Sequence, residues 1–360
     1  MGQRYRPSVP SHDETTSAET AFRQNLDEAI GTFVQTRLGS FEPLGPDVLD
    51  FVGAAAQFVS GGKRLRASFC RAGWLAAGGA DGDDRMIEAA AAIELLQGSA
   101  LVHDDLMDES DTRRGQPSVH RDFAARHRAS NRVGDPARYG QSTAILMGDL
   151  LLSWSNEMLV AAALRAEPAA ARSAITVFDA CKAEVAAGQF LDVTAQTRPE
   201  VSVADAMIVV RYKSAKYTVE RPLQIGAALA GADATMLGRL SDVALPLGEA
   251  FQLRDDVLGV FGDPEVTGKP AGDDLREGKR TVLVARTLEL TDAAGRTTVI
   301  EGLGTAAVDD VQAVIRASGA LAAVEDDIAR LEAEADAAID ALGARDVLGP
   351  LALRATRRDR

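Results

Sequence analysis

Apolar residues recur at helical spacing along nearly the whole chain from about Ala18 onward. Short turns that contain glycine interrupt this pattern, so it predicts a series of helices joined by brief connections. The expected helices are 19–37, 46–59, 64–78, 84–107, 140–166, 168–195, 202–231, 234–261, 279–291, 307–318, 320–342 and 345–356. The predicted fold class is therefore all-α, a large helical bundle.

No interior linker rich in Pro, Gly or Ser divides the helical pattern. We therefore expect a single domain over residues 18–357. Residues 1–17 are rich in Ser, Pro and Thr, and we expect them to be disordered. Segment 121–139 is polar, rich in Arg and only weakly periodic, which predicts a surface loop with a short helix.

The composition supports a folded, helical protein. Of the 360 residues, 46% are hydrophobic and 26% are charged, whereas only 5% are aromatic. Apolar content drawn mainly from Ala, Leu and Val, with few aromatic residues, favours helices over sandwiches or barrels. The formal net charge of −14 argues against nucleic acid as a partner, because such binding needs a basic surface.

The cysteines and the apolar stretches bear on location. Cys70 and Cys181 are far apart in apolar helical contexts, so we interpret them as buried free thiols, as suits a reducing cytoplasm. The polar N-terminus lacks the apolar region of a signal peptide. Glu94, Asp149 and Asp233 interrupt the most apolar stretches, so we expect no membrane span.

Two groups of aspartates follow apolar helical runs. Asp104 and Asp108 are four residues apart, which places them on one helix face, with Asp105 beside them. Like charges at that spacing repel, so a buried pair needs a cation, and an all-oxygen ligand set favours Mg²⁺. Asp255 and Asp256 repeat the arrangement. The alternative interpretation is an acidic, solvated helix end.

Basic residues stand beside glycine turns or beside these aspartates. They are Lys63, Arg66, Arg113, Arg114, Lys213, Lys216, Lys269 and Lys279. Helix N-termini and Arg side chains bind phosphate oxygens well, although each pair alone would pass for ordinary surface charge. Because phosphate groups often complete the shell of Mg²⁺, acids and bases together predict a phosphorylated ligand.

The ordered motifs resemble the polyprenyl synthetase family of trans-isoprenyl diphosphate synthases over roughly residues 30–345. Between Arg121 and Gly140 the chain resembles actinobacterial members in particular. The motifs are GGKRLR at 61, Gln97, DDLMD at 104, TRRGQ at 112, GD at 148, GQFLD at 188, YKSAKYT at 212, FQLRDD at 251 and GKPAGDDLREGKRT at 268. Each is weak alone, but their order is specific.

This resemblance implies an all-α bundle around a deep central cavity, usually a homodimer. It implies head-to-tail condensation of isopentenyl diphosphate with dimethylallyl, geranyl or farnesyl diphosphate, with release of pyrophosphate. It also implies three Mg²⁺ per active site. Asp104 and Asp108 would hold two ions and Asp255 the third, and Asp105 and Asp256 of the same two motifs are counted among the metal ligands.

The resemblance also assigns the substrate groups. The residues implied to bind the allylic diphosphate are Arg113, Lys213, Lys279 and Lys269. Those implied to bind isopentenyl diphosphate are Lys63, Arg66, Gln97 and Arg114. Those implied to line the reaction centre are Gln189, Asp192, Ser214 and Gln252. No side-chain nucleophile is needed, so we interpret His103, His120 and His127 as non-catalytic.

One position departs from the family pattern. The second aspartate motif is commonly DDxxD, but here its fifth position is Gly259. Asp263 lies further along the chain, eight residues after Asp255. We expect a working third metal site.

Product length depends on the helix before Asp104. One turn back lie the small residues Ser99 and Ala100, where members that stop at farnesyl diphosphate typically carry an aromatic ring. Leu96 and Ile93 lie roughly 12 and 16 Å from Asp104 at 1.5 Å per residue. We therefore predict geranylgeranyl diphosphate as the main product.

Several alternatives remain from the sequence alone. The product could be farnesyl diphosphate or a longer polyprenyl diphosphate. A terpene cyclase on the same fold would share an aspartate motif but would not need GGKRLR, which serves the second diphosphate. A non-catalytic subunit of a heteromeric synthase would typically have lost parts of the motifs that this chain keeps.

Overall fold

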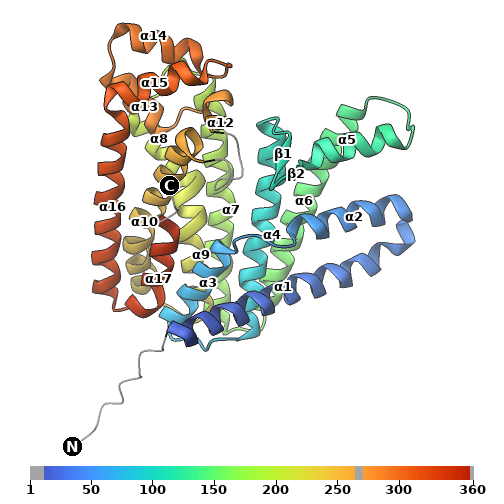
Figure 1. The fold of residues 1–360 in the computed structure, drawn as a ribbon. Helices are drawn as coiled ribbons and strands as arrows, with labels where there is room; N and C mark the ends of the chain where they lie inside the picture. Colours follow the sequence, from blue (N-terminus) through green and yellow to red (C-terminus); the bar gives the residue numbers. More distant parts are fainter. Residues whose placement is uncertain (1–11, 264–270, 357–360) are drawn as a thin grey trace, which may run out of the picture.

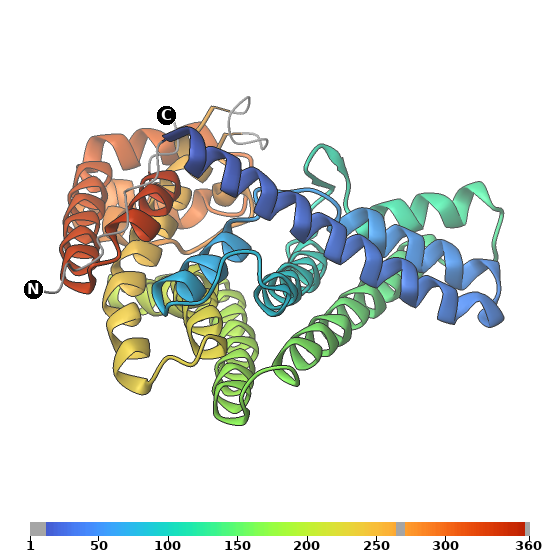
Figure 2. The same cartoon turned by 90° about the horizontal axis from the view of Figure 1, so that it is seen from below.

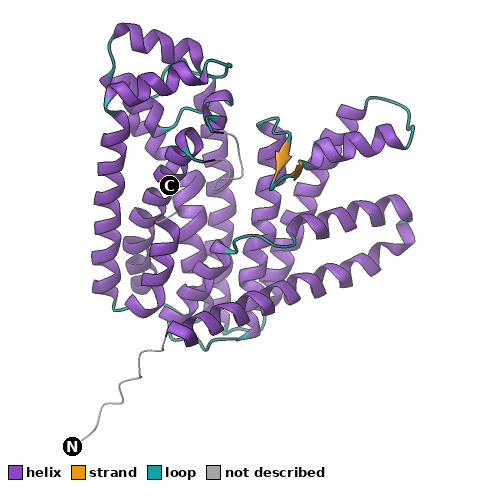
Figure 3. Ribbon diagram, in the orientation of Figure 1, coloured by secondary structure: helices purple, strands orange, loops and turns teal. Residues whose placement is uncertain are grey.

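The computed structural model describes residues 12–263 and 271–356. Within these ranges the regular secondary structure is helical apart from one two-stranded hairpin, with loops and turns between the elements (Figures 1 and 3). The prediction of an all-α fold is confirmed.

The elements of the N-terminal half are α1 (His12–Phe41), η1 (Glu42–Leu44), α2 (Pro46–Val59), α3 (Leu65–Ala76), α4 (Asp84–Met107), β1 (Thr112–Arg113), β2 (Gln116–Pro117), α5 (Val119–Ala129), α6 (Pro136–Ala163) and α7 (Pro168–Gln196). Those of the C-terminal half are α8 (Val203–Val209), η2 (Val210–Glu220), α9 (Arg221–Leu229), α10 (Ala234–Phe261), α12 (Asp273–Arg276), α13 (Val282–Leu290), α14 (Ala293–Gly302), α15 (Val308–Ser318), α16 (Ala320–Leu342) and α17 (Arg345–Thr356).

The predicted bounds of α2, α4, α10, α16 and α17 agree with the structure. Helix α1 begins at His12, so residues 12–17 are helical where disorder was expected, and residues 1–11 lie outside the described part. The physical reason is that no Pro or Gly separates His12 from the helix that follows.

The helix expected over 202–231 is divided into α8, η2 and α9. Its middle part, η2, is a π-helix. Pro222 stands in the first turn of α9. Proline lacks the N–H that a continuous α-helix requires and clashes with the preceding turn. The wider π-helix accommodates this break, and such segments often mark functional sites.

Segment 121–139 is more ordered than its composition suggested. Helix α5 covers its first part and α6 begins at Pro136. Phe123 and His127 of α5 are buried, and Arg126 on the outer face forms an ion pair with Asp50 of α2. The loop is therefore limited to the turn between these helices.

Helices α12 and α14 were not expected from the sequence. Helix α12 contains two Asp, and α14 contains Gly and Thr, all of which favour helices weakly.

The helices form two groups that meet at the centre of the molecule. Helices α1, α2, α5 and α6 extend to one side, whereas α8, α10 and α12–α17 form the other side (Figures 1 and 2). Helix α4 packs against α1, α3 and α6, and α10 packs against η2 and α16. The site described below lies where the end of α4 faces α7, η2 and α10.

Helix α6 is the described segment that is long and apolar enough to cross a membrane by length and composition. Its Met147, Leu151 and Leu159 are buried in the core, and the helix packs against α4 and α5. A core helix passes the same test, so α6 does not establish a membrane span. Cys70 and Cys181 are buried free thiols, as predicted, and burial raises the pKa of both to about 12.

Candidate active site

The first aspartate motif lies at the C-terminal end of α4. Asp104 stands in the last turn and Asp108 is the C-cap. This is an unfavourable place for carboxylates, because the helix macrodipole is negative at its C-terminus. Two lysines compensate: Lys213 Nζ lies 3.5 Å from Asp104 Oδ1, and Lys279 Nζ lies 3.6 Å from Asp108 Oδ2.

The two carboxylates differ in acidity. Burial disfavours the charge of Asp104, but Lys213, Lys279 and Arg113 outweigh it and hold the pKa of Asp104 below its usual value. Burial and the neighbouring Asp104 carboxylate raise the pKa of Asp108 to about 6. The pair therefore shares one negative charge below about pH 6 and carries two above it, once Asp108 has lost its proton.

The second motif lies near the end of α10. Asp255 is exposed, whereas Asp256 is buried. The side chains expected at the reaction centre form a chain that leads to Asp256: Ser214 Oγ donates to Gln252 Oε1, and Gln252 Nε2 donates to Asp256 Oδ1 over 2.7 Å. Burial, followed by the Asp274 carboxylate, raises the pKa of Asp256 well above its usual value.

Lys279 connects the two motifs. Besides Asp108, its Nζ lies 3.3 Å from Asp274 Oδ1 and 2.5 Å from Glu277 Oε2. Burial opposes the charge of Lys279, but Asp274, Glu277 and Asp108 together raise its pKa well above the usual value. A permanently charged ammonium thus stands between the two acidic helix ends, where a diphosphate would need neutralisation.

Lys213 is held from two sides. Its Nζ donates to Asp192 Oδ2 over 2.5 Å in addition to its ion pair with Asp104. The π-helix η2 can bring Lys213 this close because α7 carries Gly188 at the contact. A Cβ added to Gly188 would lie 2.4 Å from the Lys213 backbone nitrogen. The glycine of the GQFLD motif therefore serves close packing that places the lysine.

Asp105 does not point the same way as Asp104. It is buried and forms an ion pair with Arg113, whose Nε lies 2.8 Å from Asp105 Oδ1. Successive helical residues are rotated by about 100°, so adjacent aspartates cannot share one direction. Asp105 therefore positions Arg113 on β1. This arrangement differs from our prediction of Asp105 as a metal ligand.

The GGKRLR loop and the β-hairpin meet at a second basic region. The Arg114 guanidinium lies beside Gly62. Arg66 stacks on the Tyr217 ring at 4.6 Å and donates to Thr218 Oγ1 over 2.8 Å. Tyr217 in turn donates from its hydroxyl to Gln97 Oε1 over 2.8 Å. Arg66, Gln97 and Tyr217 line the same cavity as Asp104 and Lys213.

Lys63 is exposed, and Arg64 between it and Leu65 has a different role. The Arg64 side chain is buried, with Nη2 2.7 Å from Asp27 Oδ1 and Nη1 3.3 Å from Glu94 Oε2. It fixes the loop to α1 and α4. Lys269 lies outside the described residues.

A cavity of about 510 Å³ extends from Asp104 and Lys213 along α4 and α7. Three of the four residues expected to set product length, Leu96, Ser99 and Ala100, line it. Ile93 is not among the lining residues and is buried in the core. Ile93 lies two helical turns before Ala100 on the same side of α4, so the cavity ends before it reaches Ile93.

The opposite wall of this cavity was not foreseen beyond Gln189. It comes from α7 residues at helical spacing: Lys182, Val185, Ala186, Gln189, Phe190 and Val193. Their periodicity around Gln189 was the sequence signal that could have identified them. Gln189 itself lies near the cavity mouth, where its Nε2 is 4.0 Å from Met107 Sδ. His103 also lines the cavity, and its Nε2 is bonded to the Ile145 carbonyl at 3.2 Å.

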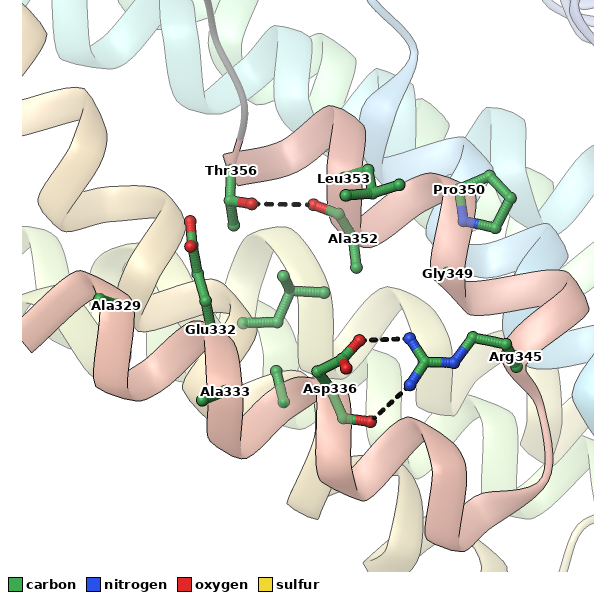
Figure 4. A pocket seen from close by; sticks show the side chains of 12 residues that line it. Ala329, Glu332, Ala333, Asp336, Arg345, Gly349, Pro350, Ala352, Leu353 and Thr356 are labelled. Carbon is green, nitrogen blue, oxygen red and sulfur yellow. Dashed lines mark hydrogen bonds and ion pairs between the residues drawn. The ribbon is translucent and has the colours of Figure 1, made fainter.

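A second hollow of about 570 Å³ lies between α16 and α17 (Figure 4). Its Arg345 is already paired with Asp336 and with Asp340. None of the predicted site residues lines it. This hollow therefore lacks the converging charges that distinguish the cavity at α4.

The acidic residues fit a hard cation for which the protein supplies only some of the ligands. In the described residues no group of three or more His, Cys, Asp or Glu side chains converges on one ion site. Asp104 Oδ1 is nevertheless buried, its contact with Lys213 Nζ is as long as 3.5 Å, and the available ligand atoms are all oxygens. Mg²⁺ typically binds through one or two carboxylates, with water and substrate phosphates as its other ligands.

Mg²⁺ binding should therefore depend on pH. Because a proton and the cation compete for Asp108, affinity should fall about tenfold between about pH 7 and about pH 5, given a pKa of about 6. Titration of the protein with Mg²⁺ alone in a calorimeter measures this. An affinity that is unchanged over that range would contradict the assignment of Asp108.

Taken together, an apolar cavity closed at one end by acidic helix termini and lysines defines a protein that handles an apolar chain carrying a diphosphate. Residues 51–318 match the model of the family described as Polyprenyl synthetase. The chain belongs to this family, and it is a trans-prenyltransferase.

Known members resemble it over most of its length. It is 34% identical over 287 residues to the geranylfarnesyl diphosphate synthase of Aeropyrum pernix, covering 78% of this chain and 83% of that protein. It is 36% identical over 248 residues to the geranylgeranyl diphosphate synthase of Sulfolobus acidocaldarius, covering 69% of each.

A solved structure is also similar. The crystal structure of geranylgeranyl pyrophosphate synthase from Corynebacterium glutamicum, complexed with isoprenyl diphosphate and magnesium, has a TM-score of 0.87 and 39% identity. The match covers 93% of this chain and 99% of that one. The actinobacterial resemblance inferred from the sequence is thereby confirmed.

Proposed function

We propose that this chain is a Mg²⁺-dependent synthase that makes geranylgeranyl diphosphate by adding isopentenyl diphosphate to a shorter allylic diphosphate. The observation that carries the proposal is the cavity that runs from Asp104 past Ser99 and Ala100 to Leu96. The names of the relatives differ in the length of the prenyl chain, so the geometry of this cavity is the better guide to the product.

The chemistry follows from the charges. Lys213, Lys279 and Arg113 surround the end of α4, where they would bind the allylic diphosphate and stabilise the charge that develops as the C–O bond breaks. Bound Mg²⁺ would supply further charge stabilisation to the departing pyrophosphate. The apolar lining, with Leu96, Val185 and Val193, keeps water from the allylic cation.

The metal assignments rest on the same geometry. Asp104 and Asp108 are proposed to hold two Mg²⁺ and Asp255 a third, with Asp256 behind it. The buried Asp104 Oδ1, which the Lys213 ammonium approaches only to 3.5 Å, supports the first site. The position of Asp255, exposed beside the buried Asp256 near the end of α10, supports the other.

The second substrate, isopentenyl diphosphate, is assigned to the basic region where the GGKRLR loop and the β-hairpin meet. We assign to it Lys63 and Arg66 from the GGKRLR loop, Arg114 from the hairpin and Gln97 from α4. The stacking of Arg66 on Tyr217 and the hydrogen bond from Tyr217 to Gln97 support this assignment, because they connect the region to the cavity mouth.

Separate diphosphate sites should be visible in kinetics. Lys63→Ala and Arg66→Ala should raise the KM for isopentenyl diphosphate about tenfold or more, with little change in the KM of the allylic partner, because each loses a charged contact to one substrate only. Lys213→Ala and Arg113→Ala should show the reverse bias or a lower kcat. Steady-state measurements with each substrate varied in turn test this. Equal effects of all four variants on both substrates would refute the assignment.

We also propose a homodimer. In the single chain, α6 and α7 expose several large apolar side chains: Ile145, Leu146, Phe190, Leu191 and Val193. Exposed apolar side chains of this size favour a protein interface, and a second copy of the chain would cover them. Light scattering coupled to size exclusion should give twice the chain mass of 37.9 kDa. A monomer at micromolar concentration would contradict this proposal.

The cytoplasm is the proposed location, supported by two buried free thiols. No described feature favours nucleic acid as a partner, and the net charge of −14 disfavours it.

One assay tests the function as a whole. Purified protein, isopentenyl diphosphate, Mg²⁺ and either dimethylallyl, geranyl or farnesyl diphosphate should release pyrophosphate and yield geranylgeranyl diphosphate by chromatography. A cyclic hydrocarbon formed without isopentenyl diphosphate would favour a cyclase. No turnover with any of the three primers would favour a non-catalytic subunit.

A further inference from the structure

The Asp274 carboxylate fills the space that a side chain at Gly259 would need. Gly259 is the fifth residue of the second aspartate motif, where the family commonly has a third Asp. A Cβ added to Gly259 would lie 1.9 Å from Asp274 Oδ2 and 2.7 Å from Asp274 Cγ. The Asp274 carboxylate therefore lies over the bare backbone of Gly259, and no larger side chain fits there unless Asp274 moves.

The segment that carries Asp274 is fixed to α10 at this point. Gly272 N–H donates to the Gly259 carbonyl over 3.1 Å. Leu275 is buried, and its carbonyl accepts from Gly304 N–H over 2.8 Å. These contacts hold the chain to the end of α10 just before Asp274 and to the turn after α14 just behind it, so the position of its carboxylate is set by packing.

The surroundings of Asp274 belong to the active site. Its Oδ1 lies 3.3 Å from Lys279 Nζ, and the same ammonium pairs with Asp108 of the first motif. On its other side Asp274 faces the buried Asp256 closely enough to raise the pKa of that carboxyl. Asp274 thus stands between the second motif and the lysine that connects both motifs.

We propose that Asp274 supplies to the second aspartate motif the carboxylate that Gly259 lacks, so that Gly259 and Asp274 together replace the usual third Asp. Asp274 is a positioning residue: it orients Lys279 and adds negative charge behind Asp255 and Asp256, which favours the third Mg²⁺ when a diphosphate is bound. This inference rests on the proposed function of the site and adds a residue to it.

The test compares substitutions that separate charge from packing. Inorganic pyrophosphate is the probe, and its dissociation constant is measured by calorimetry with and without Mg²⁺ on the full chain. Asp274→Ala should weaken Mg²⁺-dependent pyrophosphate binding by about tenfold, as the loss of an outer-shell partner typically does. Without Mg²⁺ the same substitution should not weaken pyrophosphate binding. It removes the Asp274 carboxylate, which competes with pyrophosphate for the Lys279 ammonium.

Gly259→Ala should resemble Asp274→Ala, because the new methyl group displaces the carboxylate without replacing it. In the background of Asp274→Ala, Gly259→Asp should restore Mg²⁺-dependent binding to within about threefold of wild type, whereas Gly259→Ala should not. Asp263→Ala, which removes the same charge from a nearby exposed position, is the matched control and should bind as wild type does.

Asp274→Asn keeps the shape of the side chain and guards against a folding defect in the Ala variant. Wild-type Mg²⁺-dependent binding in both Asp274 variants would overturn the inference, as would equal binding by the two double variants. Neither result would affect the proposed function, which depends on turnover and pyrophosphate binding by the wild-type chain.

Discussion

Asp104→Ala should lower turnover by about two to three orders of magnitude while the protein stays folded. The substitution removes a ligand from the end of α4, where the Asp104 carboxylate stands 3.5 Å from the Lys213 ammonium. It removes the repulsion between Asp104 and Asp108 but also the attraction of Lys213, Lys279 and Arg113, so these effects on stability oppose each other and the variant should still unfold cooperatively. Turnover by pyrophosphate release and thermal unfolding measure both effects.

Asp111→Ala is the matched control for this prediction. Asp111 is exposed and pairs with Arg121 close to the same motif, so its loss should change turnover less than twofold. Chelation of wild-type protein with EDTA should reproduce the Asp104→Ala defect. Added Mg²⁺ should restore turnover to the EDTA-treated wild type but not to Asp104→Ala. Near-normal turnover of Asp104→Ala at ordinary Mg²⁺ would refute the metal assignment.

Ala100→Phe should change the main product from geranylgeranyl diphosphate to farnesyl diphosphate or shorter. Ala100 lines the cavity one helical turn from Asp104, and a phenyl ring there would fill the space through which the growing chain passes. The first condensation should survive, because the groups around both diphosphates are unchanged. Chromatography of the products after complete consumption of the limiting substrate measures the distribution.

Two further variants separate this effect from a general loss of packing. Ala169→Phe adds the same ring to an exposed position at the start of α7 and should leave product length unchanged. Leu96→Ala removes a side chain deeper in the cavity and should shift the distribution to longer products. If Ala100→Phe still makes mainly geranylgeranyl diphosphate, the face of α4 does not determine product length.

Much of the fold follows from local patterns. The helical periodicity of α4, α10 and α16 predicted their bounds, because these helices combine apolar faces with recognisable turns at their ends. Prediction failed where local propensity and packing disagree. Helix α14 contains Gly295 and two Thr, yet it forms because Val299 is buried in the core. The π-helix η2 is invisible to periodicity, because it depends on the contacts of Pro222 and Gly188.

For the site, the sequence by itself determined which chemical groups are available: carboxylates in two helical motifs, and lysines and arginines beside glycine turns. Only the tertiary structure decided their partners. Asp105 and Asp104 are neighbours in sequence, but helix rotation directs one to Arg113 and the other to Lys213. Gly259 looks like a lost ligand in the sequence, and only the packing of α12 on α10 brings Asp274 to it. The reason is physical: residue type and local spacing are properties of a segment, whereas the distance between two charges depends on how separate segments pack.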